Sequence, residues 1–321
     1  MKTLATLTTA LLFTAGSAFA QSNDATVDQI GNDNDSEITQ IGSSNTAYIQ
    51  QGGFGGGAVQ SNNADATIEQ AGSMNDATIN QRQGFSGGTA VSMHSIDQDG
   101  SMNEAVLTTF NGGNSGEITQ VGDDNYARGR QSSSVNSIEI LQDGSGNSAD
   151  VNQLTSSGSL AEVSQTGSGN STTVDQSDAS GDAQYFETTT GDDNSVTASQ
   201  SSTWAKVDLS IEGSSNTVTA EQDRTDKAVM DIVGDSNLLS VIQGFDRNTL
   251  GASITGSSNT IMVSQTGMDN DIIELGSGHW NKDGIVVNGD ANMVDISQAS
   301  DMNRASVSIS GNSNTATITQ D

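Results

Sequence analysis

Small or hydrophobic residues alternate with polar residues over short segments of the chain. The segment 75–81, which reads NDATINQ, places Asn, Ala, Ile and Gln on every second position, with Asp, Thr and Asn between them. A period of two residues is typical of a strand that buries one face. We therefore expect Asn, Ala, Ile or Val, and Gln to face inward, and Thr, Asp, Glu and Ser to face outward.

This strand pattern recurs along the chain. Four segments share the pattern Q-x-G-x-x-N-x-A-x-x-x-Q, and they begin at Gln40, Gln70, Gln120 and Gln142. The tetrapeptide G-x-x-N marks further copies, with expected turn glycines at Gly31, Gly42, Gly72, Gly100, Gly122, Gly144, Gly167, Gly191, Gly213, Gly234, Gly256, Gly267, Gly289 and Gly311. From Gly100 onward these glycines recur roughly every 22 residues, and one interval is half that length. The repeating unit is therefore an arm of about 11 residues that ends in a turn.

Two arms form one coil of about 22 residues, strand–turn–strand–turn, which alone can neither bury its inner face nor pair its backbone. Coils stacked about 4.8 Å apart do both, in two facing parallel sheets. The pattern predicts an all-β fold, a β-solenoid with cross-β stacking and roughly 13 or 14 coils.

The inward Gln and Asn residues need hydrogen-bond partners, because an unpaired buried amide costs about 1–3 kcal/mol. Identical amides one coil above and below supply these partners. The alternative is that these residues only flank turns. The predicted stacking ladder consists of Gln29, Asn34, Gln40, Asn45, Gln51, Gln70, Asn75, Gln81, Gln98, Asn103, Gln120, Asn125, Gln131, Gln142, Asn147, Gln153, Gln165, Asn170 and Gln176.

Composition leaves two structural classes open. Hydrophobic residues make up 32% of the chain, which is too few for a thick core, and the acidic content gives a net charge of −30. A disordered acidic chain or a repeat fold with a thin core fits these values. The absence of Pro favours strands, since Pro lacks the N–H that a strand ladder needs. The charge argues against nucleic acid or an anionic membrane as a partner.

The chain divides into three parts. Residues 1–20 are typical of a secretory signal peptide, with Lys2, a short apolar stretch and the cleavage site Ala18-Phe19-Ala20. Residues 21–176 carry regular repeats with Gly-rich insertions at 52–57 and 83–88, and residues 177–321 carry degenerate repeats. Within the degenerate part, residues 177–190 are expected to be irregular. The chain has no second apolar run that would predict insertion into a membrane, so we expect a secreted product.

The sequence contains few of the residue types that catalysis and cofactor binding usually need. The chain has two His and no Cys, so nucleophile–base triads and zinc sites are not predicted. Calcium is a weaker alternative, because residues 123–125 and 192–194 (both Asp-Asp-Asn) place oxygen ligands in turns. Rows of Thr such as those at 315, 317 and 319 raise an ice-binding alternative, although such rows do not recur in every coil. We expect no enzyme activity, cofactor or metal.

The repeat resembles the curlin repeat of bacterial curli subunits, S-x5-Q-x-G-x2-N-x-A-x3-Q. The leading Ser is present at Ser92 and Ser159, whereas Asn114 and Asn136 replace it elsewhere. This resemblance implies an extracellular functional amyloid that supports adhesion and biofilm matrix. It also implies export through an outer-membrane secretion pore and a curlin-like nucleator or co-subunit.

Polymerisation is also expected from the ends of the repeat region. The repeats begin with residues 25–29 and end with residues 316–320, and neither end carries an obvious cap. Matching strand edges propagate as a filament. The predicted function is a structural subunit of a curli-like fibre at the cell surface, with a secreted monomeric β-solenoid adhesin as the alternative.

Overall fold

The computed structural model describes residues 22–52, 61–82, 91–155, 157–177, 183–201, 204–272 and 284–321. The expected signal peptide and nearly all of both Gly-rich insertions lie outside these ranges. The described residues form strands joined by short turns and contain no helix, so none of them forms a helix long and apolar enough to cross a bilayer.

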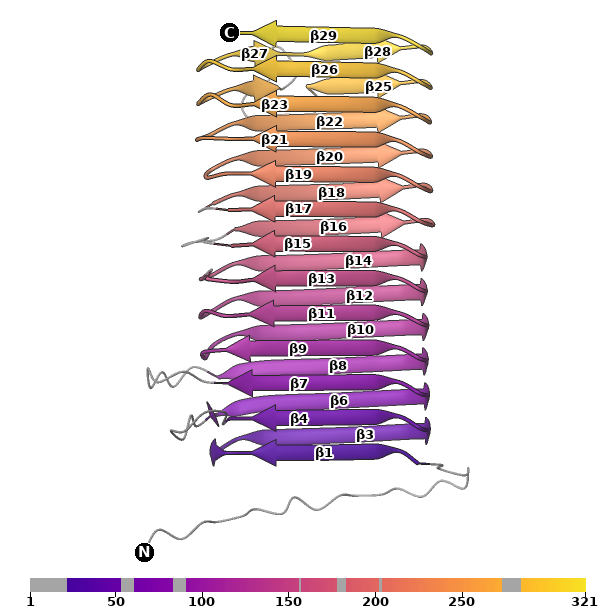
Figure 1. Cartoon of the computed structure of the whole chain (residues 1–321), viewed down its shortest axis with the longest axis vertical. Helices are drawn as coiled ribbons and strands as arrows, with labels where there is room; N and C mark the ends of the chain where they lie inside the picture. Colours follow the sequence, from indigo (N-terminus) through magenta and orange to yellow (C-terminus); the bar gives the residue numbers. More distant parts are fainter. Residues whose placement is uncertain are drawn as a thin grey trace, which may run out of the picture.

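The strands stack into two parallel sheets that face each other along one long axis (Figure 1). Sheet 1 has 13 strands, in spatial order β1 (Asp24–Gln29), β4 (Thr46–Gln51), β7 (Asp76–Arg82), β9 (Glu104–Phe110), β11 (Tyr126–Gln131), β13 (Ser148–Gln153), β15 (Ser171–Gln176), β17 (Ser195–Gln200), β19 (Thr217–Gln222), β21 (Leu238–Gln243), β23 (Thr260–Gln265), β26 (Met293–Gln298) and β29 (Thr315–Gln320). The all-β, two-sheet solenoid expected from the repeat is therefore confirmed.

Sheet 2 has 14 strands at 12 levels. They are β3 (Asp35–Ser43), β6 (Ala64–Ser73), β8 (Ser92–Ser101), β10 (Ser115–Asp123), β12 (Ser137–Ser145), β14 (Leu160–Ser168), β16 (Gln184–Thr190), β18 (Lys206–Glu212), β20 (Lys227–Val233), β22 (Thr249–Thr255), β24 (Asp271–Ile272), β25 (Ile285–Asn288), β27 (Arg304–Ala305) and β28 (Val307–Ser310). Strands β24 and β25 both pair with β22 and share one level, and β27 and β28 share the next. A further short pair joins β2 (Gly31–Asn32) to β5 (Ser61–Asn62).

The structure corrects two expectations. The solenoid has 13 levels in sheet 1 and 12 in sheet 2 rather than 13 or 14 coils. Stacked Gln side chains are usually 22 residues apart, but three coils are longer, with separations of 30, 28 and 33 residues. The stretch 177–190 is not irregular throughout, because its last seven residues form β16, which pairs with both neighbouring strands.

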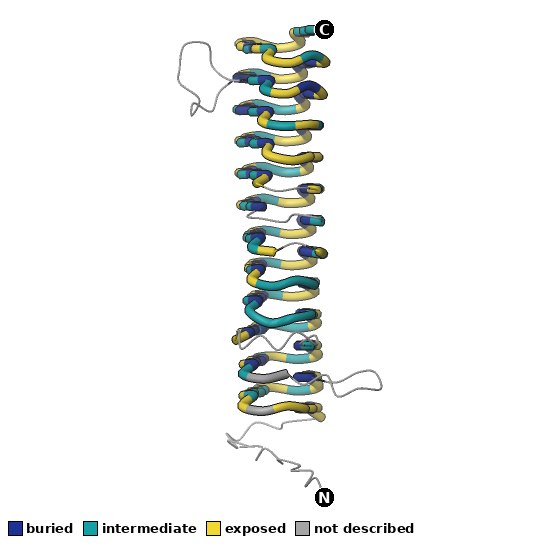
Figure 2. Tube along the Cα trace, turned by 90° about the vertical axis from the view of Figure 1, so that its left-hand side faces the viewer, coloured by how far each residue is buried: buried dark blue, intermediate teal, exposed yellow. Residues whose placement is uncertain are grey.

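The core is a thin layer between the sheets. Inward side chains are Ala, Val, Ile, Leu and single larger residues, and most are almost fully buried. Buried and exposed residues recur at equivalent places in successive coils (Figure 2). Because every coil repeats the same inward positions, like side chains lie above one another in columns along the axis, and these columns make up the candidate site.

Candidate functional site

Sheet 1 contains a nearly continuous column of Gln side chains. From Gln29 to Gln320, the Nε2 of each Gln except Gln81 donates to the Oε1 of the Gln one level further along, over 2.7 to 3.1 Å. The second Nε2 hydrogen is used as well: in Gln153 it bonds the carbonyl oxygen of Ser137 in the opposite sheet at 2.9 Å. The Nε2 groups between Gln29 and Gln298 thus have partners inside the core, and all donors of the column point the same way.

This column is interrupted at one level. Thr109 occupies the Gln position between Gln81 and Gln131. His94 of sheet 2 fills the space, and its Nδ1 lies 2.5 Å from Nε2 of Gln81. Burial lowers the pKa of His94 to about 4, so the imidazole is neutral at pH 7 and can accept this hydrogen bond.

Sheet 2 contains a shorter Gln column. Its members are Gln40, Gln70, Gln98, Gln120, Gln142 and Gln165, joined Nε2 to Oε1 over 2.8 to 2.9 Å. The next level places Thr189 at this position, and the following levels place Ile211, Ile232, Ile254, Val287 and Ile309 there. The amide column therefore becomes an aliphatic column within the same sheet.

A buried polar cluster lies where the Gln column of sheet 2 ends and the aliphatic column of the same sheet begins. Gln165 donates to Oγ1 of Thr172 at 2.9 Å, and this hydroxyl donates to Oε1 of Glu187 at 2.7 Å. The hydroxyls of Thr189 and Tyr185 also donate to the Glu187 carboxyl. Burial raises the pKa of Glu187, against the opposing effect of these hydrogen bonds. The cluster gives the last amide of the column a partner that an aliphatic residue could not provide.

Asn side chains form a column along one edge of the solenoid. At each level the backbone N–H of the Asn donates to Oδ1 of the Asn one level before, over 2.9 to 3.1 Å. The side-chain amides also stack on each other, as the sequence predicted: at nine levels Nδ2 of the Asn donates to the same Oδ1 of the Asn one level before, over 3.0 to 3.2 Å. The column runs through Asn23, Asn45, Asn75, Asn103, Asn125, Asn147, Asn170, Asn194, Asn216, Asn237, Asn259, Asn292 and Asn314.

Glycines stack beside this Asn column. Gly122 has φ of +109°, and a Cβ added to it would lie 1.9 Å from the carbonyl oxygen of Gly144. The same close approach recurs from Gly42 to Gly289, each against the glycine of the next level. Both the backbone conformation and the space therefore require Gly. Twelve of the 14 expected turn glycines lie in this column, which ends at Gly311, whereas Gly31 and Gly267 lie at the opposite edge.

The opposite edge carries a less regular column that includes Asn34. The backbone N–H of Ala64 donates to Oδ1 of Asn34 at 3.2 Å, and similar bonds link Asn114 to Asn136 and Asn248 to Asn270. Asp226 takes the place of an Asn in this column and accepts the N–H of Asn248 at 2.9 Å. Burial, and to a lesser extent Asp223 and Asp246, raise the pKa of Asp226 to about 8.

Both ends of the stack are open among the described residues. Strands β1 and β3 pair on one side only, and so do β27, β28 and β29 at the other end. Their inward residues Val27, Ile38, Ala316 and Ile318 are partly buried and pack against the core. Each end therefore presents unpaired strand edges beside apolar side chains.

Several regions of the chain match a known repeat family. The model of the curlin associated repeat matches residues 20–55, 113–154, 136–167 and 289–321. These four regions carry curlin repeats. The last match lies in the part where the sequence suggests degenerate repeats. A comparison with curated proteins found no match.

The Gln ladder extends further than the sequence-based list. That list stops at Gln176, but the columns continue through Gln200, Gln222, Gln243, Gln265, Gln298 and Gln320. Each of these Gln residues lies six positions after a column Asn, as Gln51 does after Asn45. This spacing was present in the sequence and would have identified them.

The two Asp-Asp-Asn turns have a structural role in the solenoid coils. Oδ1 of Asp123 accepts hydrogen bonds from the backbone N–H and the hydroxyl of Ser101, at 2.9 and 2.7 Å. Asp192 accepts the N–H of Ser168 in the same way. Within the described ranges no group of three or more His, Asp or Glu side chains is placed to hold a metal ion. These carboxylates cap the turn of the preceding coil.

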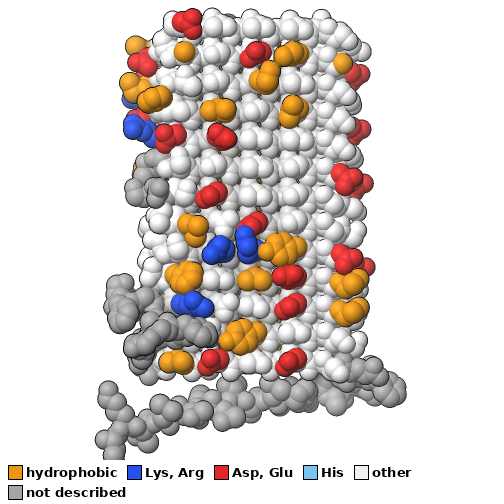
Figure 3. Space-filling model, in the orientation of Figure 1, with side chains coloured by type: hydrophobic (Ala, Val, Ile, Leu, Met, Phe, Trp, Pro, Cys, Tyr) orange, Lys and Arg blue, Asp and Glu red, His pale blue; other side chains and the backbone are white. Residues whose placement is uncertain are grey.

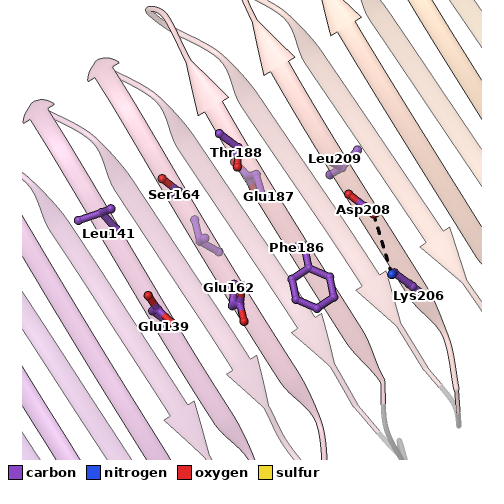
Figure 4. Close-up of a pocket in the computed structure, with 11 residues that line it drawn as sticks. Glu139, Leu141, Glu162, Ser164, Phe186, Glu187, Thr188, Lys206, Asp208 and Leu209 are labelled. Carbon is purple, nitrogen blue, oxygen red and sulfur yellow. Dashed lines mark ion pairs between the residues drawn. The ribbon is translucent and has the colours of Figure 1, made fainter.

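The outer faces carry the charges. On sheet 1, Arg128 pairs with Asp150 on the next strand, on a face where further acidic, basic and hydrophobic side chains lie scattered among uncharged polar ones (Figure 3). On sheet 2, Glu117, Glu139 and Glu162 lie in register on three adjacent strands. A surface hollow of about 450 Å³ lies beside them, and Nζ of Lys206 is 5.2 Å from the ring centre of Phe186 and 3.9 Å from Asp208 (Figure 4). No His lines this hollow, and its hydroxyl groups are those of Ser164 and Thr188.

Proposed function

We propose that this protein is a structural subunit that polymerises head to tail into a curli-like amyloid fibre outside the cell. The observation that carries the proposal is the complementarity of the two ends of sheet 1. Stacking β29 of one copy on β1 of the next places Ala316 on Ala25, Ile318 on Val27 and Gln320 on Gln29. Ala, Ile or Val, and Gln are the residues found at these positions inside the solenoid.

The direction of the amide column supports one polarity. Inside the molecule Gln298 donates to Gln320, and Gln29 donates to Gln51. Gln320 therefore has an Nε2 hydrogen for a further level, and Gln29 has its Oε1 for a preceding level. Head-to-tail contact pairs this donor with this acceptor, whereas head-to-head contact brings two acceptors together. The Asn column agrees, because Asn314 Oδ1 matches the N–H of the next copy's Asn23.

Secretion, adhesion and a role in biofilm matrix belong to the same proposal and are supported by the curlin repeats. So are a curlin-like nucleator and a secretion pore as partners. The fold and the repeat family favour a structural protein over an enzyme.

End-blocked variants of residues 21–321 test polymerisation. Ala25→Asp with Ala316→Asp places carboxylates inward at the two end strands, where they stay hydrated in the monomer but become buried at a junction. The control is Thr26→Asp with Thr317→Asp, on the outward face of the same strands.

We expect seeded elongation by the inward pair to be at least about tenfold slower than by the outward pair, because a buried unpaired charge is costly. Wild-type protein that stays monomeric at all concentrations and with seeds would instead support the monomeric adhesin. Equal elongation by both pairs would exclude this junction.

A further inference from the structure

The described solenoid begins and ends in the same sheet. Its outermost strands are β1 and β29, both in sheet 1, which has 13 levels while sheet 2 has 12. The two sheets alternate in height: Gln51 of β4 donates to the carbonyl oxygens of both Asp35 in β3 and Ala64 in β6, at 2.9 and 2.8 Å. Along the axis, the described arms therefore form an odd series that has sheet 1 at both ends.

An odd series cannot stack on itself without a gap. When β29 of one copy contacts β1 of the next at about 4.8 Å, the last level of sheet 2 and β3 of the next copy are two levels apart, about 9.6 Å. Moving the copies closer to pair these strands would place β1 and β29 at the same level. Each junction therefore leaves one strand position open in sheet 2, beside a closed sheet 1.

We propose that a single curlin-type strand from a second protein fills this position at each junction. This inference rests on the head-to-tail polymer proposed above and specifies a partner for it. The partner contributes one arm, in parallel register, to sheet 2.

The chemistry of the two borders defines the arm. On one side the inward residues are Ala305, Val307 and Ile309, and on the other they are Ser36, Ile38 and Gln40. An arm with a small residue, Ile or Val, and a third residue at alternate positions continues these columns.

Hydrogen bonding specifies two further residues of the added arm: the one at its third inward position and the one that begins it. In the Gln column of sheet 2 each Oε1 accepts from the preceding level, as Gln70 accepts from Gln40 at 2.8 Å, so Gln40 needs a donor from the added arm. At the other border, Asn303 is the last member of an Asn column, and its N–H donates to Oδ1 of Asn270. Oδ1 of Asn303 can therefore accept the N–H of an Asn that begins the added arm. The pattern is N-x-small-x-[IV]-x-Q, which is a curlin arm. Ile also fits the position of the small residue, because Ile138 stacks there on Gly116, so residues 136–142 are such an arm.

Extension of the full chain tests the gap directly. A copy of residues 132–143 added after Asp321 supplies one arm in sheet 2, so that copies can stack without a gap. A copy of residues 132–153 adds two arms and again ends in sheet 1, which makes it the matched control. A third variant carries the one-arm copy with its Gln, the equivalent of Gln142, replaced by Leu.

We expect the one-arm chain to elongate about tenfold faster or more than either the native or the two-arm chain, since its junction buries Gln40 with a donor. The Leu form is expected to lose much of this gain. A synthetic peptide of residues 132–143 should speed native assembly and enter fibres at about one peptide per chain, whereas a scrambled peptide should not.

The outcomes separate this inference from the proposed function. If all chains polymerise equally fast and fibres exclude the peptide, the ends close without an added strand and the inference is wrong while the polymer stands. If no chain polymerises with seeds and peptide, the head-to-tail polymer itself is wrong. If the two-arm chain matches the one-arm chain, added length rather than the gap controls assembly, which also overturns the inference.

Discussion

The inner column of sheet 2 differs between the first six levels and the last five. From Gln40 to Gln165 the column is made of amides that hydrogen-bond one another, and from Ile211 to Ile309 the same position is aliphatic. Both columns are continuous, and the molecule places Thr189 and the buried Glu187 cluster between them. A column position therefore accepts either chemistry provided that neighbouring levels share it. The important property is agreement between neighbours rather than Gln itself.

The glycine column is common to both regions, so its disruption should have the largest effect in each. In Gly122→Ala the new Cβ would lie 1.9 Å from a backbone oxygen, and in Gly234→Ala 2.2 Å, both at positive φ. We expect each to destabilise the fold by about 3 kcal/mol or more. Gly244→Ala is the control, because nothing lies within 4 Å of its added Cβ. Denaturant unfolding measures all three, and a Gly122→Ala protein as stable as Gly244→Ala would contradict the close stacking.

Replacing one amide by an aliphatic side chain, or the reverse, tests whether neighbouring levels of the sheet 2 column must share the same chemistry. Gln120→Leu leaves the Gln98 donor and the Gln142 acceptor unpaired, and Ile232→Gln places an amide between aliphatic neighbours. We expect each to cost about 2–4 kcal/mol in unfolding free energy. The outward neighbours Thr119→Leu and Asp231→Gln are the controls.

The aliphatic column also offers a test of cooperation between levels. Changing Ile211, Ile232 and Ile254 together to Gln lets successive amides pair, so the triple variant should cost clearly less than three times the single Ile232→Gln. Additive costs in denaturant unfolding would mean that the amides do not form a column.

Asp226→Asn should have a smaller and pH-dependent effect. The folded-state pKa is raised to about 8 from the ordinary 3.8, so the stability linked to this group is full below pH 3.8 and is lost as the pH rises through 8. The variant should therefore gain up to about 4 kcal/mol at pH 8 and little at pH 3.5. Thermal melting at both pH values measures this, with exposed Asp231→Asn as the control. A gain of equal size at both pH values would rule out a buried acid as the cause.

The repeat was sufficient to predict much of this architecture. Alternation in segments such as 75–81 predicted the inward faces, and the regular spacing of the turns predicted two parallel sheets, because both depend only on the period of the sequence. The placement of individual acids was not predictable in the same way. Glu187 and Asp226 are buried while Glu162 and Asp231 face outward, and the same residue type occurs in both settings. Whether an acid is buried depends on which alternate residues of its strand face inward. In the stretch that contains β16, the repeat motif is too weak to predict this.

The odd number of arms was also beyond the sequence-based prediction. The period gives the size of a coil, but the number of levels depends on which insertions lengthen a coil instead of adding one. The 33-residue interval between Gln265 and Gln298 spans a single level of sheet 1, although it contains enough residues for three arms.

The mass per unit length of fibres grown from residues 21–321 tests the central claim most directly. If copies stack along the solenoid axis, 13 levels of sheet 1 spaced about 4.8 Å apart give one chain per about 62 Å of a single filament. Scanning transmission electron microscopy of unstained fibres measures this value. A mass corresponding to one chain per about 4.8 Å would mean that chains unfold and stack flat, and it would contradict the head-to-tail solenoid.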